Sequence, residues 1–140
     1  VAAGTFELDA PLELKSKMTL VGAGMDKTVL TNAAGWKPAT ATLPDPEMTT
    51  KGMDTNAYLI RLKDKTTGVT VRDLTLHGPQ VHGAIYGWEP HELHVERVRI
   101  KETRWAGIRT FGMKNARIHD CEFVDAGGRW EKGKPGVKGG

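Results

Sequence analysis

One apolar pattern returns three times in this chain at almost constant spacing. The pattern is apolar-x-x-apolar-x-apolar, and its copies occupy positions 71–76, 95–100 and 118–123. A second element keeps the same phase, because Ile60, Ile85 and Ile108 follow one another at nearly the same interval. Two elements that repeat together predict a solenoid, in which each turn buries its apolar side chains against the next turn.

The turns of this solenoid are expected to consist of β-strands. The 140 residues include 17 glycines, which fall between short apolar runs and interrupt every candidate helix. In 91–106, the best helical candidate, the apolar spacings of two and three residues suit short strands better than a helical stripe. One residue from each turn should then stack in each of three internal ladders: Ile60, Ile85 and Ile108; Leu74, Val98 and Cys121; Leu76, Ile100 and Phe123.

The sequence thus predicts a single all-β domain, a parallel β-helix with coils of about 23 residues. A leucine-rich repeat has an overlapping period, but its Leu-x-x-Leu-x-Leu-x-x-Asn signature is absent. Composition divides the chain into four parts: an entry coil over 1–30, a long excursion loop over 31–57, regular coils over 58–126 and a glycine-rich tail over 127–140. The tail has no capping character, so we expect the solenoid to be part of a longer one.

Four segments carry a resemblance to a known superfamily: 4–8, 18–24, 67–78 and 114–123. In these segments the chain resembles the right-handed parallel β-helices of the pectate-lyase-like superfamily. The resemblance implies a right-handed β-solenoid, a polysaccharide ligand and an extracellular or periplasmic location. It does not fix the activity, because the superfamily includes lyases, glycosidases, epimerases, esterases and phage tail proteins.

The catalytic motifs of two of these families are incomplete. Arg99-Ile100-Lys101 and His82-Gly83 match parts of the polygalacturonase pattern, but its upstream acidic elements are missing. Without a pair of carboxylates, an inverting glycosidase has neither acid nor base. The calcium-site aspartates and the Arg-x-Pro-x-x-Arg segment of classical pectate lyases are missing as well.

An outward ladder supplies the candidate catalytic residues. Between the inward residues of each turn stand Arg61, Tyr86 and Arg109, which should face solvent one above the other at the ~4.8 Å spacing of adjacent strands. Guanidinium groups bind carboxylates in a bidentate manner. By the resemblance to β-helix lyases, Arg61 or Arg109 would neutralise a uronate carboxylate, and Tyr86 or His82 would remove the adjacent proton. The competing explanation is a solvated or ion-paired charged face.

Trp88 and Trp105 flank this ladder and are the candidate substrate-binding residues, because exposed aromatic rings stack on sugars. The alternative role of the two tryptophans is to pack the loops against the coils. We expect no metal and no cofactor. The five histidines show no ligand spacing on one predicted face, and His94 and His119 fall at surface positions of the repeat.

The preferred hypothesis is a carbohydrate-active protein that binds and cleaves an anionic polysaccharide by β-elimination. A structural or adhesive β-helix and a glycoside hydrolase with its acids elsewhere remain as alternatives. A nucleic-acid partner is not expected, because the net charge is only +3 and the basic residues are interleaved with acidic ones. No apolar run is long enough for a membrane span. The sugar and the oligomeric state stay open.

Overall fold

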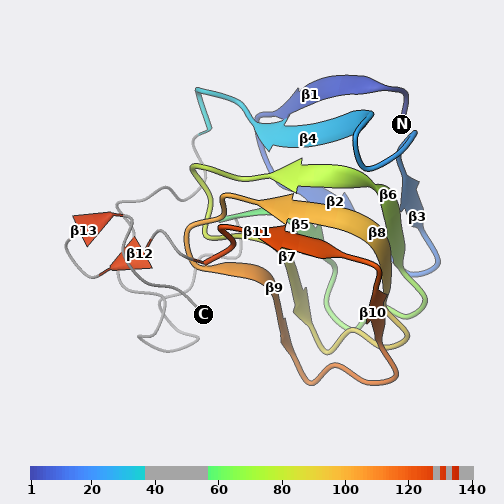
Figure 1. Cartoon of the computed structure of the whole chain (residues 1–140). Helices are drawn as coiled ribbons and strands as arrows, with labels where there is room; N and C mark the ends of the chain where they lie inside the picture. The colour runs from blue at the N-terminus through green and yellow to red at the C-terminus, as the bar shows by residue number, and fades with distance from the viewer. Residues whose placement is uncertain (37–56, 128–129, 132–133, 136–140) are drawn as a thin grey trace.

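Short strands in each coil pair in parallel with strands of the coils before and after it. The computed structural model describes residues 1–36, 57–127, 130–131 and 134–135. In these residues the chain is a parallel β-solenoid of about four turns, and none of them is helical. Figure 1 shows the coils stacked in chain order, from β1 at one end of the stack to β9, β10 and β11 at the other. The prediction of a parallel β-helix is confirmed.

Two sheets carry the stack. The first contains seven strands: β1 (Gly4–Leu8), β3 (Thr19–Val21), β4 (Thr28–Asn32), β6 (Thr70–His77), β8 (His94–Lys101), β10 (Arg117–His119) and β11 (Glu122–Val124). The second contains four: β2 (Leu12–Leu14), β5 (Tyr58–Leu62), β7 (Gly83–Trp88) and β9 (Ala106–Phe111). A separate antiparallel pair joins β12 (Trp130–Glu131) to β13 (Lys134–Pro135).

The register of the strands follows the sequence repeat. Ile60 pairs with Ile85 and Ile85 with Ile108, so the first expected ladder is present. Leu74 pairs with Val98, and Ile100 stands between Leu76 and Phe123. These aliphatic ladders form one buried core, because a coil can hide its apolar side chains only against its neighbours.

Three successive coils turn a corner at a residue in the left-handed backbone region, within β6, within β8 and between β10 and β11. Asp73, Arg97 and Asp120 occupy this corner in three successive coils, with φ values of 60°, 49° and 53°. The corner separates the two parts of each long strand, so the first part pairs with β3 or β10 and the second with β4 or β11. Side chains of opposite charge meet there, since Arg97 Nε donates to Asp73 Oδ1 at 2.6 Å.

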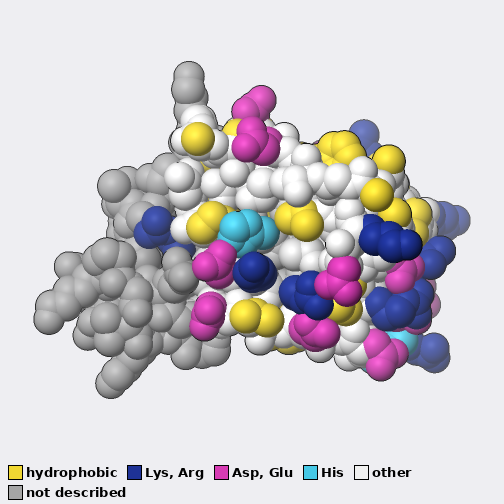
Figure 2. Space-filling model, turned by 45° about the horizontal axis from the view of Figure 1, so that its top comes forward, with side chains coloured by type: hydrophobic (Ala, Val, Ile, Leu, Met, Phe, Trp, Pro, Cys, Tyr) yellow, Lys and Arg dark blue, Asp and Glu magenta, His cyan; other side chains and the backbone are white. Residues whose placement is uncertain are grey.

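Charges of both signs lie close together on one face of the molecule. Figure 2 shows Lys and Arg side chains interleaved with Asp and Glu side chains on the face that it presents. Arg99 illustrates the pattern, because it pairs with Glu122 at 2.7 Å and with Asp26 at 2.6 Å. Side chains of opposite charge from different coils thus meet on the surface at Arg99.

The last coil is more exposed than the coils before it. Phe123, expected in an internal ladder, keeps 52% of its surface exposed because no described strand covers it on the far side. Residues 37–56 of the predicted excursion loop, and most of the predicted tail 127–140, lie outside the described residues. Among the residues described, no helix is long and apolar enough to cross a membrane.

Candidate functional site

The sheet β2–β5–β7–β9 carries the predicted outward ladder in the expected register. Arg61 pairs with Tyr86, and Tyr86 pairs with Arg109. The ladder extends one coil further than expected, because Glu13 stands opposite Arg61 and accepts a hydrogen bond from its Nη2 at 3.0 Å. Arg61 is thus engaged in an ion pair between coils, which competes with its predicted role of neutralising a substrate carboxylate.

Tyr86 differs from the prediction of a solvent-facing ladder, since only 5% of its surface is exposed. Its ring packs against Tyr58 at a centroid distance of 5.2 Å and against Phe111 at 6.4 Å. Burial raises the pKa of the Tyr86 hydroxyl, and the negative charge of Asp64 raises it further, while Arg109 acts in the opposite direction. Tyr86 therefore holds its proton at neutral pH and is poorly suited to act as a base.

His82 lies inside the coil stack rather than at its surface, with 1% of its surface exposed. Its backbone links three coils: the His82 amide donates to the Ala57 carbonyl at 2.8 Å, and its carbonyl accepts from the Trp105 and Ala106 amides at 2.9 Å. The sequence placed His82 correctly beside the β7 strand. The structure adds that a polymer on the surface would not reach its ring directly.

Arg109 lies within a row of aromatic rings. Its Cζ atom sits 3.8 Å from the centroid of the Trp105 ring and 4.9 Å from that of Phe111. Trp88 continues the row at 5.3 Å from Phe111 and keeps 37% of its surface exposed. Of the two predicted tryptophans, Trp105 contacts Arg109 directly, and Trp88 is connected to it through Phe111.

Phe111 was not predicted from the sequence as part of this row. The residue lies at the end of β9, opposite Trp88 in β7. The repeat itself was a signal that could have found it, because Trp88 and Phe111 are separated by the same interval as Ile85 and Ile108. Arg109 as a whole is partly exposed, although its Nε atom is buried and finds no hydrogen-bond partner among the described residues. A guanidinium group at such a position is suited to an anionic group.

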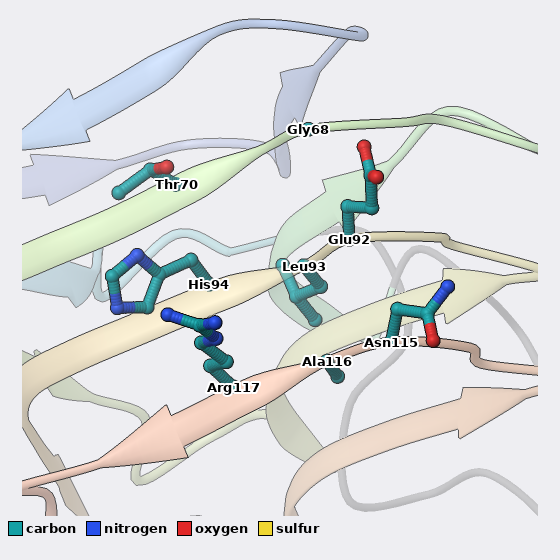
Figure 3. A pocket seen from close by; sticks show the side chains of 8 residues that line it. All are labelled: Gly68, Thr70, Glu92, Leu93, His94, Asn115, Ala116 and Arg117. Atoms are coloured by element: carbon teal, nitrogen blue, oxygen red, sulfur yellow. The ribbon is translucent and has the colours of Figure 1, made fainter.

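A second group of polar side chains lies on the other sheet. His94, Glu96 and His119 each direct one potential ligand atom into the same space, and these atoms lie within 4.8 Å of one another. Beside them runs a groove of about 580 Å³. Figure 3 shows His94 and Arg117 side by side at one end of this groove, with Glu92 and Asn115 at the other. The repeat places His119 opposite Glu96, but spacing along the chain does not give the orientation of the two histidine rings.

Comparison with known proteins adds no relative. No protein-family model matches the chain, and no significant match was found among curated proteins or solved structures.

Proposed function

We propose that this chain is a carbohydrate-binding β-solenoid of the pectate-lyase-like type, which holds an anionic polysaccharide across the outer face of the β2–β5–β7–β9 sheet. The observation that carries the proposal is the Arg109 guanidinium stacked on Trp105, at one end of an aromatic row. Aromatic faces stack on sugar rings, and a guanidinium group binds a uronate carboxylate or a sulfate. The proposal also implies an extracellular or periplasmic location.

Trp88 and Phe111 complete the binding surface. Both are at least partly exposed, and their centroids lie 5.3 Å apart in adjacent coils. A row of rings across successive coils suits an extended polymer better than a small compact ligand, because each coil adds one contact along the stack. The charge at Arg109 then favours uronates or sulfated sugars over neutral ones.

We propose binding rather than cleavage at this face. β-Elimination needs a base that reaches the sugar, and both candidates, Tyr86 and His82, are buried. Burial also raises the pKa of Tyr86, which makes the phenolate form scarcer. The row itself consists of Arg109 and three aromatic side chains. These groups can bind a polymer, but none of them is a base that could remove a proton.

The test measures binding of the purified chain to polygalacturonate, to alginate and to a neutral galactan. Binding is measured by calorimetry and by affinity electrophoresis. We expect Arg109→Gln and Trp88→Ala each to weaken binding to the acidic polymers by about tenfold, which corresponds to the loss of one charge-assisted contact or one stacked ring. Lys101→Gln is the matched control, because it removes one positive charge from an exposed position on the other sheet.

Two results would contradict the proposal. The first is an absence of binding to all the polymers. The second is an equal loss of binding in Lys101→Gln and Arg109→Gln, which would indicate attraction by net charge alone. Ultraviolet absorbance of unsaturated uronate products, followed in the same samples, tests the cleavage hypothesis; product formation that Tyr86→Phe abolishes would replace binding by lyase activity.

A further inference from the structure

We propose that His94, Glu96 and His119 form a binding site for a divalent transition-metal ion such as Zn²⁺. The three ligand atoms are His94 Nε2, Glu96 Oε2 and His119 Nε2. Two imidazoles and one carboxylate are a common ligand set for zinc and related ions. The site lies on the sheet that contains β8 and β10, so it is independent of the polysaccharide surface proposed above.

The fold creates the site by stacking two coils. His94 and Glu96 are two residues apart in β8, so their side chains share one face of the strand. His119 in β10 pairs with Glu96 in the parallel register, which places its ring beside that of His94. The two rings are stacked, with centroids 5.0 Å apart and an interplanar angle of 29°. Three ligands thus converge although the two histidines are distant in sequence.

The two ring nitrogens face each other at a distance that requires something between them. His94 Nε2 and His119 Nε2 are 2.9 Å apart. Two nitrogen lone pairs at this distance repel, so the space must hold either a proton or a cation. Nitrogens bound to one zinc ion at ~2.0–2.1 Å in tetrahedral geometry lie roughly 3.3 Å apart, so a small outward shift of the rings admits the ion.

Neighbouring residues orient two of the three ligands. His119 Nδ1 lies 2.9 Å from Asp120 Oδ2, and a proton on Nδ1 donated to this carboxylate leaves the Nε2 lone pair directed at the site. Arg97 Nη1 pairs closely with Glu96 Oε1, which leaves Oε2 directed toward His94 at 3.6 Å. A carboxylate behind a ligating histidine is typical of zinc sites.

The ligand atoms and the neighbouring charges determine which metal ion the site favours. Arg117 pairs with His94 in the register and lines the same groove, so the site is not strongly anionic (Figure 3). Ca²⁺ and Mg²⁺ need several oxygen ligands and would find only Glu96 here, whereas Zn²⁺ binds imidazole nitrogen well. Three protein ligands leave further coordination positions for water or for an anionic group from the groove.

The test is calorimetric titration of the chain with Zn²⁺, after removal of any histidine tag, with a chromophoric chelator as competitor. We expect one Zn²⁺ per chain. Asp120→Asn should weaken binding by about 10–100-fold, and His94→Gln or His119→Gln by at least as much. His91→Gln is the matched control, because it removes an imidazole that is not among the three ligands found in the described residues.

Several outcomes would overturn the proposal: no saturable Zn²⁺ binding, equal loss of binding in His91→Gln, or displacement of Zn²⁺ by an equal concentration of Ca²⁺. Circular dichroism of each variant checks that its strands are intact. Should the histidine variants fail to fold, Asp120→Asn decides the matter, since its exposed side chain contacts the site only through His119.

Discussion

Asp73, Arg97 and Asp120 adopt a backbone conformation that most residues avoid. Their positive φ values let each coil bend sharply without a glycine, at a steric cost that the stacked strands on either side sustain. Aspartate accepts this conformation more readily than arginine does. Arg97 forms ion pairs with Asp73 and Glu96 at this corner, in addition to the pairing of the strands on either side.

The pH dependence of stability should reveal the Asp73 ion pair. The hydrogen bond from Arg97 lowers the pKa of Asp73, and the charges of Arg97 and Arg72 lower it further. A carboxyl with a depressed folded pKa stabilises the fold above its unfolded pKa of 3.8, and this contribution is lost as the pH falls through the folded pKa. The melting temperature of the parent should therefore fall further than that of Asp73→Asn when the pH is lowered from about 5 to about 2. Asparagine tolerates the same φ.

The measurement is thermal unfolding by circular dichroism across that range, with Asp9→Asn as a control at an exposed turn residue. An Asp73→Asn variant that loses as much melting temperature on acidification as the parent would contradict the assignment.

At the scale of the element, β7 is the strand on which the second sheet depends. It pairs with β5 on one side and β9 on the other, and its first residue, Gly83, gives room to a ring from the coil before. A Cβ atom at Gly83 would lie 2.5 Å from Tyr58 Cε1 and 2.8 Å from the Ala106 carbonyl oxygen. The Tyr58 ring fills the space that a side chain would take, and it supports Tyr86 in the same layer.

Gly83→Ala should therefore destabilise the chain by about 1–3 kcal/mol, because the buried ring or the β9 backbone must move. Gly35→Ala is the matched control, since a Cβ atom there meets nothing within 4 Å. Urea unfolding followed by circular dichroism gives both free energies. Equal stability of the two variants would show that the Tyr58 ring does not need the space above Gly83.

On the scale of the whole molecule, stacking protects every coil except the outermost ones. β9, β10 and β11 each pair with a strand on one side only in the part of the chain described. Ile118, Phe123 and Val124 are exposed at this end, and an apolar hollow of about 690 Å³ lies beside them. Unpaired strand edges with apolar side chains are prone to association.

The isolated chain is therefore expected to self-associate through this end. Phe123→Lys should lower the associated fraction seen by analytical ultracentrifugation over a concentration series, because a charge on the edge disfavours pairing. Trp88→Lys places the same charge at another exposed aromatic residue on β7, a strand that is paired on both sides, and should leave association unchanged. A parent chain that stays monomeric throughout the series would contradict this expectation.

The sequence determined which residues stack. The constant period of the apolar positions predicted the ladder of Ile60, Ile85 and Ile108, and with it the register of Arg61, Tyr86 and Arg109. This inference succeeds because strands pair with a fixed spacing, so an equal number of residues per coil brings equivalent positions together. The ion pair between Asp73 and Arg97, which are 24 residues apart, agrees with the same spacing.

Only the tertiary structure decided what each outward side chain meets. Tyr86 is buried and His82 lies within the stack, whereas the repeat alone predicted an open face. The approach of His94 to His119 depends on how the rings are oriented between two coils, which a spacing in the sequence does not contain. A period specifies neighbours along a ladder, but accessibility and side-chain distance depend on the bends of the coil and on what packs against each face.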